Sequence, residues 1–407
     1  MSEINPLKPD FVFSFREIVS APAKALELKK IFIGGLSLLV ALAFYDCFVY
    51  LAVAVDGLTV SSFFKSHSFF PFSDIRFVTL TAKALFTFGV LFGLYAILHG
   101  FLAIALITIE ELRGNRLCSA RDGLRFSLSR WKQTFLALAS IGLFLFFLLA
   151  FNSGLGLIAH IPWIGPSLYS VLFVIPGFLV ALFTVVIALV FVLSLLILPA
   201  ATAADRVGES FTSIVETFST FLRQPFRWIG YTVFSFGAAK LCVWLLAALS
   251  AFAVKSFVWL SSLTGGPVVG ATFAGGARQL PLRGWLVDFS ASLWPGLKVA
   301  GVELGFDITR WGKGGAEGVA ATLMAVALVV IFAYIWGYGM SIIATSQSVA
   351  YVIIRKLRDD YDITAEDPQF LEPEWINPPL NDTGESIEDH TDVAETKPTE
   401  SSETGNA

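Results

Sequence analysis

The sequence predicts an all-α polytopic membrane protein with six transmembrane helices and short amphipathic helices at the membrane surface. Of its 407 residues, 56% are hydrophobic and 15% are charged, which is too apolar for an ordinary soluble domain. The apolar residues form six stretches, each long enough to cross a hydrocarbon core of about 30 Å, which takes about 20 residues. Helices satisfy their own backbone polar groups where water is absent. The predicted spans are residues 31–55, 78–109, 133–160, 167–200, 228–260 and 318–354.

Charge divides the chain into two regions. Residues 1–358 carry 27 Lys and Arg against 17 Asp and Glu, whereas residues 359–407 carry one Lys against 15 Asp and Glu. The first region is the predicted membrane domain. The second is predicted to be a disordered tail, because an acidic segment with few apolar residues cannot bury enough surface to fold. This tail is also a candidate binding segment for a protein partner.

Basic residues beside the spans predict the orientation. Seventeen Lys and Arg flank the span ends on one side, and seven lie in the loops on the other. The positive-inside rule therefore places both termini in the cytoplasm. The first 30 residues contain no continuous apolar run, so we expect no signal peptide.

A basic amphipathic segment precedes every second span. Residues 111–131 and 205–225 match at four positions at an offset of 94, and residues 18–34 match residues 214–230 at five positions at an offset of 196. Either the chain contains three repeats of one amphipathic helix and two spans, or such helices resemble one another generically. The first segment departs from the others, because Pro22 would break or start a helix.

Two of these segments have an apolar stripe at helical spacing, which predicts helices that lie in the membrane interface and favour anionic headgroups. The stripes are Leu117, Ala120, Leu124, Leu128 and Trp131 in one segment and Phe211, Ile214, Phe218 and Leu222 in the other. The candidate headgroup contacts are the neighbouring basic residues, Arg121, Arg125, Arg130, Lys132, Arg223 and Arg227.

Three ionisable residues lie inside the predicted spans, where a charge is costly and needs a partner or a function. Asp46 and Lys240 have similar depths in spans one and five and could form an ion pair, and His99 in span two is an alternative partner for Asp46. Such a polar cluster could relay protons or ions, or it could simply hold helices together.

Other positions predict local features of the helices. Pro176 predicts a kink in span four, and Asn152 indicates close packing or a loosened end of span three. Gly337 and Gly339 predict a close helix contact in span six. Residues 263–317 form an outer loop that begins as a glycine-rich flexible linker and continues with a surface helix around Trp285–Trp294. A re-entrant loop is the alternative for that helix.

The sequence contains no catalytic, cofactor, metal or nucleic-acid-binding motif. Its three cysteines, Cys47, Cys118 and Cys242, are expected to be small apolar packing residues. Glu110 and Glu111 are adjacent and point to different faces of a helix, so a solvated helix end beside Arg113 explains them better than acid–base catalysis.

Two stretches carry a resemblance to known families. Residues 197–230 place an amphipathic helix after a small-residue Pro motif (ILPAATAA), and residues 351–364 run from a basic to an acidic end (YVIIRKLRDDYDIT). This arrangement resembles uncharacterised bacterial polytopic families grouped near the membrane domain of glycerophosphodiester phosphodiesterases and the YciC-like proteins. The resemblance covers about residues 100–365, carries no catalytic residues and implies the bacterial inner membrane.

These observations lead to three hypotheses for the function. The first is a non-enzymatic inner-membrane protein that binds anionic lipid through its basic helices and a protein partner through its body or its tail. The second is a transporter or channel with a path near Asp46, His99 and Lys240. The third is a lipid-modifying enzyme that uses Glu110 and Glu111.

Overall fold

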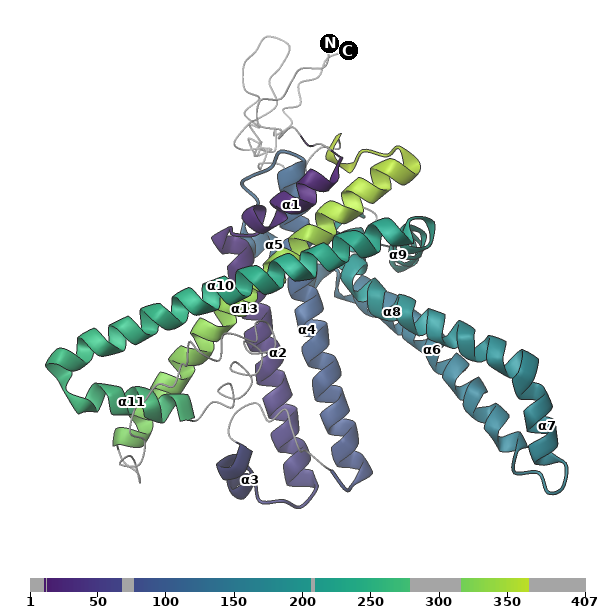
Figure 1. Ribbon diagram of the computed structural model, residues 1–407, viewed down its shortest axis with the longest axis horizontal. Helices are drawn as coiled ribbons and strands as arrows, with labels where there is room; N and C mark the ends of the chain where they lie inside the picture. The colour runs from purple at the N-terminus through teal and green to yellow at the C-terminus, as the bar shows by residue number, and fades with distance from the viewer. Residues whose placement is uncertain (1–10, 12, 68–76, 206–208, 279–315, 366–407) are drawn as a thin grey trace, which may run out of the picture. The chain divides into compact units, whose positions relative to one another are not determined.

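The computed structural model describes residues 11, 13–67, 77–205, 209–278 and 316–365, and the regular structure in these ranges is helical (Figure 1). The chain divides into two units at Pro368. All described residues belong to the first unit, and residues 366–407, with most of the predicted tail, lie outside the described part. The predicted surface helix around Trp285–Trp294 also lies outside it.

Six helices in the described part are long and apolar enough to cross a membrane, which confirms the predicted fold class. The chain is therefore a multi-pass membrane protein. The helices lie within a few residues of the predicted spans, except at the start of the fourth. They are α2 (Leu28–Val55), α4 (Leu80–Leu112), α6 (Trp131–Ile158), α8 (Phe178–Ala204), α10 (Pro225–Gly265) and α13 (Ala316–Asp359).

A short helix precedes α2, α6 and α10, as the three basic segments predict. These helices are α1 (Phe15–Lys24), α5 (Ala120–Ser129) and α9 (Ser210–Arg223). In α5, the side chain of Ser119 accepts a hydrogen bond from the Asp122 backbone, and the Asp122 side chain accepts one from the Ser119 backbone. The expectation for Pro22 was wrong, because α1 begins before it and continues to Lys24. Pro22 lies in the last turn, so its missing N–H removes one helical hydrogen bond to the carbonyl of Ile18, and the helix ends two residues later.

The predicted kink at Pro176 is an interruption of the helix. After α7 (Gly165–Leu172), residues Phe173–Gly177 form a π-helical turn that contains Pro176, and α8 begins at Phe178. Proline lacks the N–H that a regular helix needs at this position. The long apolar helix of the fourth span therefore starts 11 residues later than the sequence predicts.

The glycine-rich start of the outer loop is not a flexible linker. Residues Pro267–Arg278 form α11, which packs against α10 and α13. A Cβ atom added at Gly276 would lie 2.7 Å from the Cβ of Met324 on α13. The glycine therefore permits a close helix contact here, and composition alone does not distinguish this use of glycine from flexibility.

The predicted boundary of the tail at residue 359 is also wrong. After α13 ends at Asp359, residues Ile363–Ala365 form a 3-10 turn, η4, and Ile363 is buried. The backbone oxygen of Ile363 accepts a hydrogen bond of 3.4 Å from Nε of Arg113, at the end of α4. The folded unit thus extends at least to Ala365.

Helices α2 and α13 approach each other backbone to backbone, which confirms the close contact predicted at Gly337. A Cβ atom at Gly34 would lie 2.5 Å from the carbonyl oxygen of Gly337, and one at Gly337 would lie 2.7 Å from that of Ile31. Gly339 packs against the side chain of Val243 of α10, whose Cγ2 would lie 2.5 Å from an added Cβ. Without a hydrophobic driving force between helices in lipid, such small-residue contacts let backbones pack closely.

The three short helices follow one packing rule. Taking each short helix with the next two spans gives three units, and the second spans, α4, α8 and α13, all contact one another. α5 packs on α4 and α2 of the first unit, α9 packs mainly on α8 and α6 of the second, and α1 packs on α13 and α10 of the third. Each short helix therefore lies on the spans of the preceding unit in cyclic order, as three repeats would arrange.

The matched residues of the three segments do not share roles, however. Ser119 is an exposed helix cap, whereas Ser213 is buried and accepts a hydrogen bond of 2.8 Å from Gln133. Gly34 contacts Gly337, whereas the aligned Gly230 has no neighbour within 4 Å of an added Cβ. The packing order and not the residue identities supports the repeat, and its origin by duplication stays a prediction.

Polar side chains join neighbouring spans within the apolar region. Gln347 of α13 accepts a hydrogen bond of 3.1 Å from the indole N–H of Trp228 and donates one of 3.0 Å to Thr232, both on α10. Asn152 of α6 donates one of 2.8 Å to Thr184 of α8, so it indicates close packing and not a loosened end. Each hydrogen bond satisfies polar side-chain groups for which the lipid tails offer no partner.

The end of α2 is held to the start of α4 by Asp56. Its carboxylate accepts hydrogen bonds from the backbone N–H groups of Val78, at 3.0 Å, and Thr79, at 2.8 Å, and from the Thr79 hydroxyl. These bonds, first those of the Thr79 and Val78 backbone, lower the pKa of Asp56 below its ordinary value. A group with a lowered pKa in the fold stabilises the fold above its unfolded pKa of about 3.9.

We therefore expect this junction to loosen as the pH falls below about 4. As the pH is lowered from 6 to 3 in the wild-type protein, the hydrogen-exchange rates of the Val78 and Thr79 amides should rise relative to the intrinsic exchange rate at each pH. The variant Asp56→Asn should show fast exchange at pH 6 and lose this dependence. Equal protection in both proteins across the range would contradict the role of the carboxylate.

Candidate functional site

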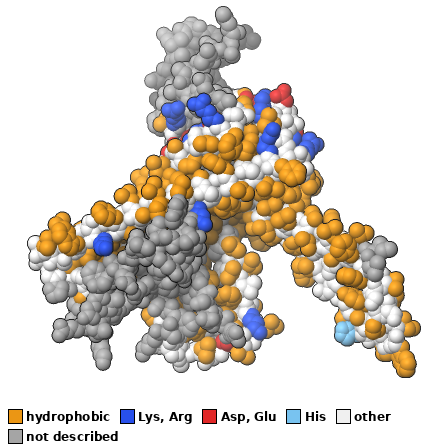
Figure 2. All heavy atoms as spheres, in the orientation of Figure 1, with side chains coloured by type: hydrophobic (Ala, Val, Ile, Leu, Met, Phe, Trp, Pro, Cys, Tyr) orange, Lys and Arg blue, Asp and Glu red, His pale blue; other side chains and the backbone are white. Residues whose placement is uncertain are grey.

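Charged side chains gather at the end of the spans where the three short helices lie. Figure 2 shows Lys and Arg side chains over this end, whereas the spans present mainly apolar side chains. The long helices contribute the start of α2 and the ends of α4 and α13. The burial of these charges differs, and this difference separates a structural core from an accessible surface.

The side chain of Lys30 is completely buried in this core. Its Nζ donates to the backbone oxygen of Lys24, at 3.0 Å, and lies 2.5 Å from Oε2 of Glu111. Lys24 is the last residue of α1, whose final carbonyls have no partner within the helix. The lysine therefore joins the negative end of α1 to the end of α4. Lys29 lies 2.7 Å from Oε1 of Glu111.

Glu110 faces away from Glu111 and forms a second buried pair. Its Oε1 lies 3.0 Å from the guanidinium of Arg113, and both side chains are completely buried. The two carboxylates thus point to different faces of α4, as predicted. The prediction of a solvated helix end is wrong, because both residues are held in ion pairs and only 15% of the Glu111 side chain is exposed. Charges at this depth need such pairing.

A third ion pair connects α9 with α13. Arg358 has only 3% of its side chain exposed and lies 2.6 Å from Oε2 of Glu216. Its guanidinium also donates to the Thr220 hydroxyl at 3.3 Å and to Asp359. These contacts hold the end of the last span against α9.

Helix α9 has an inverted distribution of polar and apolar side chains. The face that packs on the spans consists of Ser213, Thr217 and Thr220, which are all buried. The outer face carries Phe211, Val215 and Leu222, of which 74%, 46% and 62% are exposed. Water would disfavour this arrangement, because it leaves large apolar side chains unburied. The outer face therefore suits contact with an apolar medium.

Helix α5 combines the same kind of face with free positive charge. Gly123, Phe126 and Ser127 pack inward, whereas Leu128 and Leu117, just before the helix, are exposed. The predicted stripe is thus divided, because Ala120 and Leu124 pack on the buried cluster around Ile107. Ser127 contacts His99 of α4, and a Cβ at Gly123 would lie 3.1 Å from the backbone oxygen of Ala103.

The six candidate headgroup residues differ in accessibility. Arg121 and Arg125 are exposed on α5, and no described residue bonds to either. Arg130 is half-buried, lies over the Phe126 ring and donates to Gln133. The other three are exposed beside internal contacts: Lys132 with the Trp131 ring, Arg223 with Asp359 at 3.6 Å and Arg227 with Gln224 at 3.1 Å.

The three ionisable residues within the spans are not brought together. His99 lies 2.7 Å through Nδ1 from the hydroxyl of Ser127, which donates to the His99 backbone oxygen. Lys240 is exposed on α10. Asp46 is half-buried on the side of α2 that faces α3. No ion pair joins Asp46 to Lys240 or His99 in the described ranges, so the expected cluster does not form there.

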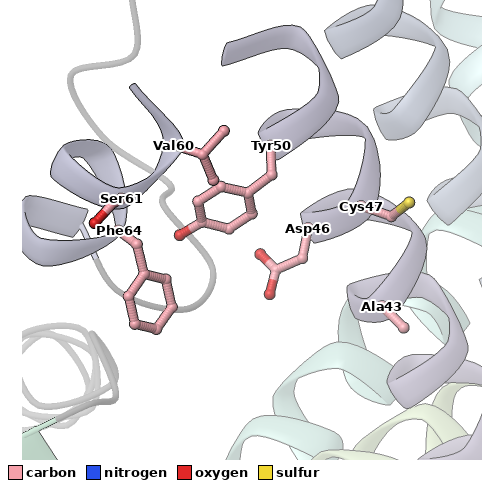
Figure 3. A pocket seen from close by; sticks show the side chains of 7 residues that line it. All are labelled: Ala43, Asp46, Cys47, Tyr50, Val60, Ser61 and Phe64. Carbon is pink, nitrogen blue, oxygen red and sulfur yellow. The ribbon is translucent and has the colours of Figure 1, made fainter. Parts of the chain in front are cut away.

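Asp46 instead lines an open cavity of about 830 Å³ between α2 and α3 (Val60–His67) (Figure 3). Helix α2 contributes Ala43, Asp46, Cys47 and Tyr50, and α3 contributes Val60, Ser61 and Phe64. Cys47 is exposed here, unlike the buried packing residue that the sequence predicts. Cys118 does fit that expectation, since burial and the nearby carboxylates of Glu110 and Asp122 raise its pKa to about 12.

Sequence reasoning missed the buried charges at the basic end. In the sequence, Lys30 and Glu111 resemble ordinary charged residues at the ends of spans. Their pairing could not be predicted, because it depends on how α1, α2 and α4 pack together. Gln133 was missed as well, although a buried glutamine at the start of a span is unusual; it donates to Asp205 at 3.0 Å and to Ser213. Comparisons with family models, curated proteins and solved structures give no match, so the resemblance to the YciC-like families stays a prediction.

Proposed function

We propose that this membrane protein binds anionic phospholipid through the surface formed by α5, α9 and their flanking basic residues, and that it has no catalytic activity. The observation that carries the proposal is the outward apolar face of α9 beside exposed arginines. Apolar side chains such as Phe211 and Leu222 can enter the headgroup–acyl boundary, while Arg223 and Arg227 stay at headgroup level. Arg121 and Arg125 of α5 add two exposed positive charges.

The charge at this end also supports an orientation. Anionic lipid gives the cytoplasmic leaflet a negative surface potential, which attracts basic segments beside spans. We infer that the short helices lie on the cytoplasmic face, with both termini on that side, and that the membrane is a bacterial inner membrane. The acidic tail is repelled by the negative surface of the cytoplasmic leaflet, and we propose that it binds a protein partner away from the membrane.

The alternatives receive less support from the described residues. A transport path needs polar groups in a connected series, but Asp46, His99 and Lys240 have separate surroundings. A catalytic carboxylate needs access to substrate, but Glu110 is completely buried in its pair with Arg113. Glu111 is engaged by both Lys29 and Lys30. Both carboxylates therefore serve the packing of the helix ends.

Purification in mild detergent followed by native mass spectrometry tests the proposal. We expect phosphatidylglycerol or cardiolipin to remain bound to the full-length protein in preference to zwitterionic lipid. We also expect a protein partner to be lost when residues 366–407 are removed. Retention of zwitterionic and anionic lipids in proportion to their abundance would contradict the lipid part of the proposal, and phosphodiesterase or lipid-transferase turnover would contradict its non-enzymatic part.

A further inference from the structure

We propose that the turn between α6 and α7, residues 159–164, lies in the phospholipid headgroup layer of the leaflet opposite the basic end, with Trp163 as its anchor. Helix α6 begins at Trp131 beside α5, at the basic end, and the turn follows its other end at Ile158. The turn is therefore far from the arginines of α5 and α9. The inference is independent of the proposed binding of anionic lipid by those helices.

Helix α6 is as long as a whole membrane is thick. Its 28 residues rise 1.5 Å each and extend about 42 Å. A bilayer measures about 40–45 Å when both headgroup regions are included. Trp131 is exposed at the start of α6, and tryptophan prefers the membrane interface. With Trp131 at one interface, the other end of α6 reaches the opposite interface and not the water beyond it, and any tilt of the helix places that end deeper.

The turn is apolar, and the hairpin of α6, α7 and α8 carries no charge that would draw it into water. Residues 133–204 contain no Asp, Glu, Lys or Arg. Ile161 and Ile164 are exposed at the turn, 98% of Trp163 is exposed, and apolar side chains extend to the tip of this hairpin in Figure 2. The turn after α2 differs, because it contains Asp56. The apolar surface of the α6–α7 turn therefore continues the lipid-facing surface of the two spans.

The backbone of the turn suits a layer with little water. Pro162 has no N–H, and four of the other five residues donate to backbone oxygens at 2.9–3.2 Å. These four are Ala159, His160, Ile161 and Ile164. Pairing of this kind is what a segment near hydrocarbon needs. The N–H of Trp163 is accepted by no residue in the described ranges, and a phosphate or a water of the headgroup layer can accept it.

The conformation of Trp163 presents its side chain to the surroundings of the protein. The N–H of Ile164 donates to the backbone oxygen of Pro162 at 2.9 Å, which closes a tight turn around Trp163. Trp163 has a φ of 71°, a left-handed conformation that favours glycine over a bulky residue. Its exposed indole makes almost no contact within the protein that could offset this strain. Contact of the indole with the membrane interface accounts for a tryptophan at this position.

Tryptophan fluorescence of the full-length protein in nanodiscs tests the proposal. The nanodiscs contain phosphatidylcholine that is brominated either close to the headgroup or near the end of the acyl chain, and bromine quenches an indole on contact. The fluorescence difference between wild type and Trp163→Phe isolates the indole of Trp163, and this replacement keeps an aromatic residue at an exposed position. Trp131→Phe is the matched variant at the start of α6. Phe147→Trp adds an indole at an exposed position near the middle of α6 as a reference for depth.

We expect the signal of Trp163 to be lost mainly with the lipid that is brominated close to the headgroup, as for Trp131. The signal added by Phe147→Trp should be lost mainly with the lipid that is brominated near the chain end. Three results would overturn the proposal for Trp163. Quenching by aqueous iodide and by neither lipid would place the turn in water, and stronger quenching by the chain-end bromine would place it in the hydrocarbon core. Quenching by none of these reagents would show that a protein chain covers the turn.

Discussion

Replacing Arg113 with methionine is expected to lower the free energy of unfolding by about 3–5 kcal/mol, the usual cost of leaving a buried charge without its partner. The side chains of Arg113 and Glu110 are both completely buried, and the guanidinium of Arg113 lies 3.0 Å from Oε1 of Glu110. Arg113 also donates to the backbone oxygen of Ile363, so its loss should free η4 from α4. Unfolding in mixed detergent and dodecyl sulfate, followed by tryptophan fluorescence, measures the change.

The double variant Glu110→Leu/Arg113→Met separates the pair from its surroundings. It removes both charges, so we expect it to be more stable than Arg113→Met alone. Arg116→Met is the control, because Arg116 is exposed on the turn after α4 and should change stability by less than about 0.5 kcal/mol. Additive effects of the two replacements would show that the ion pair is not energetically coupled.

Replacing Gly337 with leucine is expected to cost about 3 kcal/mol or more, the upper range for overpacking. An added Cβ would meet the backbone of Gly35 and Ile31, at 2.5 Å and 2.7 Å from their nearest atoms, and a helix backbone cannot move aside as a side chain can. The crossing of α2 and α13 should therefore open. The melting temperatures of Gly337→Leu and Gly337→Ala in detergent measure how the loss of stability depends on the size of the side chain at this position.

Gly230→Leu is the matched control for this contact. Gly230 also lies in a span, but nothing comes within 4 Å of an added Cβ there. We expect its melting temperature to equal or exceed that of the wild type, because leucine favours a helix more than glycine does. A similar loss of stability in Gly337→Leu and Gly230→Leu would refute a specific contact at the crossing.

The six spans could be predicted because the need for apolar residues in a bilayer is a local property of the sequence. The contact at Gly337 was predictable for a related reason, since small residues among large ones indicate a helix interface. At Gly275 and Gly276 the glycines were instead interpreted as a flexible linker, and this prediction was wrong because they pack α11 on α13. Composition does not tell these two uses of glycine apart.

The buried ion pairs could not be predicted because they depend on tertiary contacts. Lys30 is far in sequence from Glu111, and Glu216 from Arg358, and their pairing follows from the packing of α1, α5 and α9 on the spans. The ion pair predicted from the similar depths of Asp46 and Lys240 was wrong for the same reason. Depth in the membrane says nothing about the direction in which a helix face points, and Asp46 faces α3.

The orientation of the amphipathic helices was only partly predictable. Helical spacing identified apolar stripes in α5 and α9, but a stripe does not coincide with the packing face. Ala120 and Leu124 of the α5 stripe pack inward, whereas Leu128 is exposed. In α9, the packing face is made of Ser213, Thr217 and Thr220, whose small side chains allow close approach to the spans. The large apolar residues then face outward, which is the arrangement that a membrane surface requires.

The central claim is that basic residues on these short helices bind anionic lipid, and titration of phosphatidylglycerol into the delipidated full-length protein, followed by native mass spectrometry, tests it most directly. Each exposed Arg near the headgroups contributes about 1 kcal/mol, so Arg121→Gln/Arg125→Gln should weaken binding at least about tenfold. The charge-matched control Lys83→Gln/Lys255→Gln, on exposed residues toward the other end of the spans, should bind like the wild type. Equal affinity of the arginine variant and the control would contradict the claim.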